Sequence, residues 1–383
     1  MFKRKPALWR ALLLATSIGL LSLGATAAPA RAQTAELDAL NAQILENPQD
    51  AGLNLNYARV AEQQGKLRLA LAAYERVLIN DPDNLDAQHG YELLRRIIEP
   101  AYSSLRIEIG EQWDSNALDL SDNAREAATT YANATWVDER RFGDRRWRTY
   151  ANVQAEITPE IHELNYGYLG VQTGPFIDLT PTAALIPSVG GAVSSFSDRF
   201  YFGEVNASAT VEGHRDGATY WSRLRAGWRD YGEDSTAKQG AYAELMGGVS
   251  LPGVVSSNDW LVAIPWVRWS GIQGSTVDFL SDPIAPGKYA EAGIDASYNY
   301  RVNDRISLAV GAMARERHYT QTEVAGQNRH DTYVAPKASM TLWNLFDCSC
   351  GLTLSYQHRN NRSNDDFSDY DGDRASISVM RQF

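Results

Sequence analysis

The amino-acid sequence predicts a membrane all-β fold, a β-barrel of roughly 14 strands preceded by a small all-α domain. Two observations predict it. After Pro100 the spacing of apolar residues changes from about 3.6 to about 2 and keeps that period to the end of the chain. The connections between the resulting strands are mostly long on one side and short on the other. We expect a signal peptide at residues 1–32, a helical domain at 33–100 and the barrel at 101–383.

The N-terminal residues are typical of an export signal. "MFKRKPALWR" supplies a basic segment, "ALLLATSIGLLSLGATAA" an apolar one, and "ARA" before Gln33 a cleavage site. An uncleaved anchor helix is the alternative. No Cys lies near the cleavage site, so we expect no lipid attachment there. Because no later run of about 20 apolar residues exists, the mature protein is predicted to be a soluble exported protein or a membrane β-barrel.

Residues 33–100 have a helical period and an internal repeat. Pro48 and Pro82 lie 34 residues apart in the related phrases "ENPQD" and "NDPDN". Between them, small and aromatic residues match the positions that a tetratricopeptide repeat conserves, so the segment resembles one full repeat with partial repeats on either side. A plain helical hairpin is the alternative. Stacked repeats present a concave surface to extended peptides, and the expected groove residues are Tyr57, Ala58, Gly65, Ala70 and Tyr74.

From residue 101 onward, fourteen runs with period 2 can be placed. In "YWSRLRAGWRDY", Leu224, Ala226 and Trp228 share one face while three arginines occupy the other. Backbone groups in lipid have no water to bond, so such a sheet must close on itself. A soluble β-sandwich or an array of repeats is the alternative. Seven tryptophans could form the interfacial girdles of a barrel: Trp147, Trp221, Trp228, Trp260, Trp266, Trp269 and Trp343.

The connections predict the orientation in a bacterial outer membrane. Long loops are expected at 114–127, 188–198, 232–237, 271–287, 319–328 and 362–371, with a shorter one at 158–160. The opposite connections are mostly tight, as in "FGDR", "TGP", "HRDG" and "VND". Outer-membrane barrels have long extracellular loops and short periplasmic turns. Taking the helical domain as periplasmic places the long loops outside the cell, which is this outer-membrane arrangement.

The C-terminal strand ends "RASISVMRQF", with Ile377, Val379 and Phe383 on one face. A terminal Phe on an alternating last strand resembles the signal by which the barrel assembly machinery recognises outer-membrane proteins. Arg381 departs from that signal, because an aromatic or apolar residue usually stands there.

The interior of the barrel is predicted to carry charges of both signs. Interleaved charges usually form a lattice of ion pairs that narrows a bore, whereas a conduit for a charged polymer favours one sign. The predicted lumen-lining residues are Arg106, Glu108, Glu156, Glu204, Glu212, Arg223, Arg225, Arg229, Glu244, Glu291, Asp295, Arg315 and Lys337.

Other residues give weak indications of chemistry. The net charge of −11 argues against nucleic-acid binding, the six histidines are dispersed, and no nucleophile-elbow motif is present, so we expect neither an enzyme nor a cofactor. Cys348 and Cys350 fall in a predicted periplasmic turn and are interpreted as structural. A solvated loop is the simpler interpretation of a run of carboxylates that could otherwise bind Ca²⁺, namely Asp365, Asp366, Asp369, Asp371 and Asp373.

The layout of export signal, short repeat segment and barrel resembles the surface lipoprotein assembly modulators. Two phrases carry the resemblance: "DSN" at 114–116 and "YQHRNNRSND" at 356–365. The helical part is shorter than in that family. The resemblance implies a translocator that holds a periplasmic or surface client protein on its repeats and passes it to the barrel. An exopolysaccharide export porin and a passive pore with a docking domain are the alternatives.

Overall fold

The computed structural model describes residues 30–383 apart from 82–83, 99–100, 144, 181, 216, 234, 275–282 and 346–349. Residues 1–29, and with them nearly all of the predicted signal peptide, lie outside the described residues, as do Pro82 and Cys348. None of the described helices is long and apolar enough to cross a membrane.

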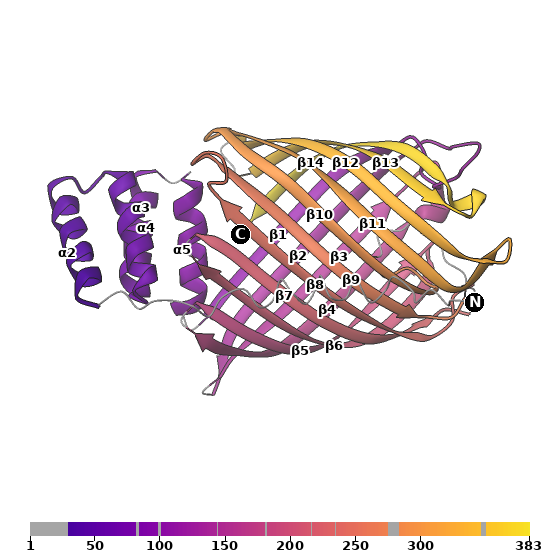
Figure 1. Ribbon diagram of the computed structural model, residues 1–383, viewed down its shortest axis with the longest axis horizontal. Helices are drawn as coiled ribbons and strands as arrows, with labels where there is room; N and C mark the ends of the chain where they lie inside the picture. The colour runs from indigo at the N-terminus through magenta and orange to yellow at the C-terminus, as the bar shows by residue number, and fades with distance from the viewer. Residues whose placement is uncertain are drawn as a thin grey trace, which may run out of the picture.

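Four helices form the N-terminal part of the described chain: α2 (Ala30–Glu46), α3 (Ala51–Gln63), α4 (Leu67–Asn80) and α5 (Leu85–Ile98). The Asp50 side chain caps α3 by accepting a hydrogen bond from the Leu53 backbone N–H at 2.9 Å. Gly65, with φ +70°, supplies the left-handed residue between α3 and α4. The helices stand side by side at one end of the barrel, with α5 next to it (Figure 1).

Small residues let these helices approach closely. Ala58, Ala61, Ala70 and Ala73 are fully buried in the core between them. A Cβ added to Gly90 of α5 would lie 2.3 Å from the Tyr74 ring, so only glycine fits there.

Fourteen strands follow and close into one antiparallel barrel, in which each strand pairs with the next and β14 pairs with β1. The predicted fold class is confirmed. The strands are β1 (Ala101–Asp114), β2 (Ala127–Phe142), β3 (Arg145–Ile157), β4 (Tyr166–Thr180), β5 (Ala183–Phe196), β6 (Arg199–Arg215), β7 (Ala218–Tyr231), β8 (Gly240–Pro252), β9 (Asp259–Gly271), β10 (Lys288–Asn303), β11 (Ile306–Val324), β12 (Gln327–Leu345), β13 (Cys350–Ser363) and β14 (Tyr370–Gln382).

The two ends of the barrel differ. The end that carries the helices, called the helical end below, also holds the C-terminus (Figure 1). Its connections are short, as at 143–144 and 304–305, whereas the far end has longer ones at 115–126, 158–165, 232–239 and 272–287.

Three predicted connections are wrong. The "TGP" segment lies inside β4, where Pro175 pairs with Trp147 of β3. The loop expected at 188–198 is strand up to Phe196, and β11 continues to Val324 before a two-residue turn. Glycine stands inside the strand at 174 because the backbone is crowded there. A Cβ added to Gly174 would lie 1.8 Å from the Pro187 carbonyl oxygen.

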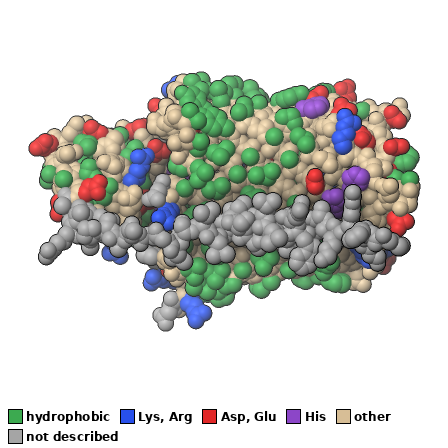
Figure 2. Space-filling view, in the orientation of Figure 1, with side chains coloured by type: hydrophobic (Ala, Val, Ile, Leu, Met, Phe, Trp, Pro, Cys, Tyr) green, Lys and Arg blue, Asp and Glu red, His purple; other side chains and the backbone are tan. Residues whose placement is uncertain are grey.

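The outer wall is apolar. Val205, Leu224 and Val310 are more than half exposed, although each lies in the middle of a strand. Hydrophobic side chains cover much of the visible wall, while most charged groups lie toward the ends (Figure 2). A period-2 wall with an apolar outer face is typical of a lipid-facing barrel.

Candidate functional site: the barrel lumen

Register places the predicted lumen charges on the inner face. Glu204 and Arg229 are paired residues of β6 and β7, and Arg225 pairs with Glu244 of β8. The neighbours of these residues along the strands, such as Val205, point outward. The same alternation puts the remaining predicted lumen residues on the inner side: Arg106, Glu108, Glu156, Glu212, Arg223, Glu291, Asp295, Arg315 and Lys337.

Glu204 is the centre of the first inner cluster. Its carboxylate accepts hydrogen bonds from Arg229 Nε at 2.8 Å, from Tyr242 Oη at 2.5 Å and from Asn206 Nδ2 at 2.7 Å. Arg225 forms a further ion pair with it. The side chain of Glu204 has no exposed surface, so this part of the lumen is packed rather than filled with water.

A second cluster continues from β8 to β11. Arg268 joins two carboxylates, donating to Glu244 at 2.6 Å and to Glu291 at 2.8 Å. Glu291 also accepts from Arg317 Nε at 2.8 Å and from Trp266 Nε1 at 2.7 Å. Each buried carboxylate of the two clusters therefore pairs with at least two arginines, as an interior of low polarity requires. Arg268, Arg317 and Trp266 were not predicted to take part.

Aromatic side chains and a loop close the space above the Glu204 cluster. Tyr201, Phe202 and Tyr231 pack together with Ile272 and Ile284, two fully buried residues of the far-end loop 272–287. Arg229 lies 4.0 Å over the Phe202 ring and donates to the Ile284 carbonyl oxygen at 2.7 Å. We call the two carboxylate clusters and this cap the far-end layer.

The other predicted lumen charges are less buried. Lys337 donates to both oxygens of Asp295, at 2.6 and 2.7 Å. Arg106 and Glu108 are partly exposed and 3.4 Å apart. Arg315 lies over the Tyr333 ring and 3.9 Å from Glu291, so it borders the far-end layer. These pairs leave the half of the lumen that they line more open than the far-end layer.

The helical half of the lumen contains a cavity of about 440 Å³. Arg148 of β3 bridges part of it, donating to Glu139 of β2 at 2.7 Å and to Glu212 of β6 at 2.5 and 2.6 Å. Helix α5 contributes His89, Leu93 and Ile97 to the lining; the wall adds aromatic and hydroxyl groups, including Tyr150, Phe176, Thr210, Thr219 and Trp221. Among the predicted girdle tryptophans, Trp221 and Trp266 face the lumen, whereas Trp228 and Trp269 are exposed on the outer wall.

The helices are attached to the rim of this cavity. Arg146 Nη2 of β3 donates to the Ile97 carbonyl oxygen of α5 at 2.5 Å. Gln382 of β14 donates to Glu92 of α5 at 3.3 Å. On α3, Glu62 lies 3.7 Å from His214 of β6. These contacts come from β3, β6 and β14, so the helices cover the barrel mouth from several sides.

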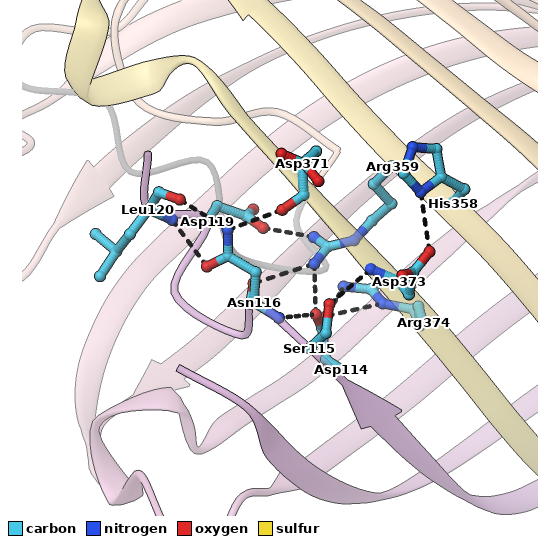
Figure 3. Close-up of polar contacts among 10 residues, drawn as sticks. All are labelled: Asp114, Ser115, Asn116, Asp119, Leu120, His358, Arg359, Asp371, Asp373 and Arg374. Atoms are coloured by element: carbon cyan, nitrogen blue, oxygen red, sulfur yellow. Dashed lines mark hydrogen bonds and ion pairs between the residues drawn. The ribbon is translucent and has the colours of Figure 1, made fainter. Parts of the chain in front are cut away.

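At the far end, the two phrases that resemble the family meet, 240 residues apart in sequence (Figure 3). The Asp114 carboxylate accepts from Arg359 Nη2 at 2.5 Å and from Arg374 at 3.0 Å. Ser115 Oγ accepts from the Asp373 backbone N–H at 2.8 Å. Asn116 donates to the carbonyl oxygens of Leu120 and Asp371. We call this cluster the clasp, because it ties the loop 115–126 across β14 to β13, where the barrel closes.

Asp119 adds a titratable group to the clasp. It has φ +52° and its carboxylate pairs with Arg359. Burial raises the pKa of Asp119 to about 6, against the opposing attraction of Arg359 and Arg374. Its carboxylate is therefore half protonated near pH 6.

The acidic residues of the last loop have separate partners. Asp369 pairs with Arg362, Asp365 lies 3.7 Å from Arg329, and Asp373 accepts from Tyr356 at 2.6 Å. Within the described residues, no three His, Cys, Asp or Glu side chains converge as metal ligands. Cys350 is disulfide-bonded.

The expected groove residues lie inside the helical layer. Tyr57, Ala58, Ala70 and Tyr74 are buried, because these positions hold the helices together. Tyr74 donates to Glu62 at 2.6 Å, and burial raises the pKa of both groups. The exposed apolar side chains of the layer are instead Leu45, Leu69 and Ile79. At the other end of the chain, Ile377, Val379 and Phe383 are exposed together on the outer wall.

The last strands match a known protein family. The family model described as surface lipoprotein assembly modifier matches residues 285–383, which contain β10 to β14. The match includes the 356–365 phrase and ends far from the 114–116 phrase. The C-terminal part of the chain is therefore similar to that family. None of the curated proteins compared matches the chain.

Several solved structures are similar to the chain. They include the outer membrane channel DcaP of Acinetobacter baumannii, with 10% identity and a TM-score of 0.46 over 74% of this chain and 97% of that one. OmpT, an outer membrane protein of Vibrio cholerae, has 8% identity and a TM-score of 0.40 over 74% and 100% of the two chains. OccAB1 of Acinetobacter baumannii has 7% identity and a TM-score of 0.40 over 75% and 97%.

Proposed function

We propose that this protein is an outer-membrane barrel that assists the assembly of surface proteins. Its N-terminal helices, which we interpret as tetratricopeptide-like, lie in the periplasm and hold an exported client protein at the barrel mouth. The barrel then helps the client to reach the cell surface. The similarity of residues 285–383 to the surface lipoprotein assembly modifiers carries the proposal.

The outer wall and the connections support the placement in the outer membrane. The exposed apolar face suits lipid, and short turns at the helical end suit the periplasm. The exposed face of β14 with Ile377, Val379 and Phe383 would be recognised by the barrel assembly machinery during insertion.

The packed lumen argues against a passive pore. Side chains that line a water-filled channel are exposed, whereas those of Glu204, Glu244 and Glu291 have at most 1% exposed surface. An exopolysaccharide export porin is the second candidate. It is favoured by Tyr150, an aromatic side chain that is 38% exposed inside the lumen, and by Trp221, which lines the same cavity.

The test is surface display of a lipoprotein in cells that express this protein. A candidate lipoprotein is produced with and without the full chain, and protease accessibility on intact cells is measured. We expect display only with the full chain, and its loss in the double variant Leu69→Asp and Ile79→Asp. Arg68→Asp is the matched control, because it adds a carboxylate to an exposed neighbouring site without removing apolar surface.

Surface display that is independent of the protein would overturn the proposal. Export of a polysaccharide without any effect on protein display would support the second candidate. Uptake of small sugars by liposomes containing only the purified protein would indicate a passive pore.

A further inference from the structure

The cavity under α5 has hydrogen-bonding groups whose capacity is not used. His214 is 5% exposed and lines the cavity, and its Nε2 has no hydrogen-bond partner. Its nearest charged neighbour is Glu62, at 3.7 Å. The buried Nε of Arg223, also in the lining, has no partner either. Buried polar groups are nearly always paired, so these two atoms are available to a ligand: Arg223 Nε as a donor, and His214 Nε2 as a donor in the tautomer that carries its proton there.

Other parts of the lining are apolar. Leu93 and Ile97 of α5 face a wall that includes Ile186, Phe176 and Trp221. The Trp221 ring lies flat on the wall over Gly248, where an added Cβ would lie 2.2 Å from its Nε1. A bulky apolar side chain can therefore be enclosed between the helix and the wall.

The two arginines that line the cavity are already compensated. Arg148 is neutralised by Glu139 and Glu212, and Arg223 by Glu244 at 3.2 Å. A phosphate or another multiply charged anion would meet no surplus of positive charge. A neutral acceptor such as a backbone carbonyl suits His214 and Arg223 better than an anion does, because a carbonyl needs a hydrogen-bond donor but no surplus positive charge.

We propose that this cavity binds an extended segment of a passenger polypeptide. One bulky apolar side chain lies between Leu93, Ile97 and Trp221, and backbone carbonyls accept hydrogen bonds from His214 and Arg223. This proposal rests on the proposed function, which identifies the passenger as the exported client protein. The cavity opens beside the helices that we expect to hold that passenger, so the segment would move directly from helices to barrel.

The test uses the full chain in detergent and a fluorescein-labelled heptapeptide, Gly-Ser-Leu-Trp-Leu-Ser-Gly, with fluorescence anisotropy as the readout. Ile186→Trp fills the cavity and is expected to abolish binding. Leu185→Trp is the matched control, because the neighbouring residue of β5 points to the outer wall. His214→Phe keeps the ring and removes its nitrogens, so we expect binding to weaken about tenfold. Heat-modifiable mobility in gels verifies that each variant is folded.

Equal binding by wild type and Ile186→Trp, or no binding at all, would overturn the proposal. Binding of maltoheptaose that Ile186→Trp blocks, without binding of the heptapeptide, would replace the peptide by a saccharide. The two proposals can fail separately. If the variants change peptide binding but lipoprotein display does not depend on the protein, the peptide site in the cavity is upheld and the proposed function is refuted.

Discussion

The two halves of the lumen use similar residues to opposite effect. In the far-end layer, each glutamate carboxylate pairs with at least two arginines and has at most 1% exposed surface, and aromatic rings pack with Ile272 and Ile284 over the Glu204 cluster. In the helical half, a cavity remains, and two nitrogens of its lining, His214 Nε2 and Arg223 Nε, lack hydrogen-bond partners. The lumen is therefore packed toward the far end and keeps a cavity toward the end that carries the helices.

Breaking the far-end layer is expected to have the largest effect. Glu204→Ala would leave Arg225 and Arg229 buried without a carboxylate, at a cost of about 3–5 kcal/mol. The layer should loosen and admit large solutes, which an increased sensitivity of cells to vancomycin would reveal. Glu108→Ala is the control, since its partner Arg106 is half exposed and the pair contributes little. Equal sensitivity in both variants would refute the closed layer.

The clasp is expected to stabilise the strands at which the barrel closes. Asp114→Ala removes the common acceptor of Arg359 and Arg374, so we expect a loss of about 3 kcal/mol of local stability. Cleavage of the loop 115–126 by external protease on intact cells should become faster. Asp122→Ala, in an exposed part of the same loop, should leave the rate unchanged. A clasp without structural importance would give the same rate for both variants.

The pH dependence of the clasp follows from Asp119. Its pKa of about 6 lies above the ordinary value of 3.8, so folding favours the protonated form. The stability that Asp119 contributes is complete below about pH 4 and is lost as the pH rises through 6, by about 3 kcal/mol. Asp119→Asn should therefore slow hydrogen exchange in the loop 115–126 at pH 7.5 and change little at pH 4. Faster exchange at pH 7.5 would mean that the Arg359 ion pair outweighs burial.

The smallest effect concerns the helical side. Alanine normally stabilises a helix relative to glycine by about 1 kcal/mol. Gly90→Ala should instead destabilise the helices by about 1–3 kcal/mol, because the new methyl group would overlap the Tyr74 ring. The rate at which trypsin cleaves within residues 30–98 of the full chain, in a limited digestion, measures this loss of stability. If the Gly90→Ala variant resists trypsin better than the wild type does, the helices pack less tightly around Gly90 than its contact with the Tyr74 ring requires.

Much of the fold could be predicted from the period of the apolar residues. Alternation alone predicts the barrel and the inward side of residues such as Arg225 and Glu291. The partners could not be predicted, because a network such as Glu244, Arg268 and Glu291 depends on the register of three strands. Trp221 and Trp266 were misplaced because an aromatic ring suits both a lipid interface and a packed lumen. The "TGP" turn was wrong because glycine and proline are also tolerated inside a strand where the backbone is crowded.

Single-channel recording of the wild-type protein in a planar bilayer would show whether the lumen is closed. A lumen closed by the far-end layer should show almost no steady conductance, with only brief openings. Glu204→Ala should conduct continuously in the same experiment. A large, stable conductance of the wild type would contradict the account, because it would mean that the charged layer leaves an open channel.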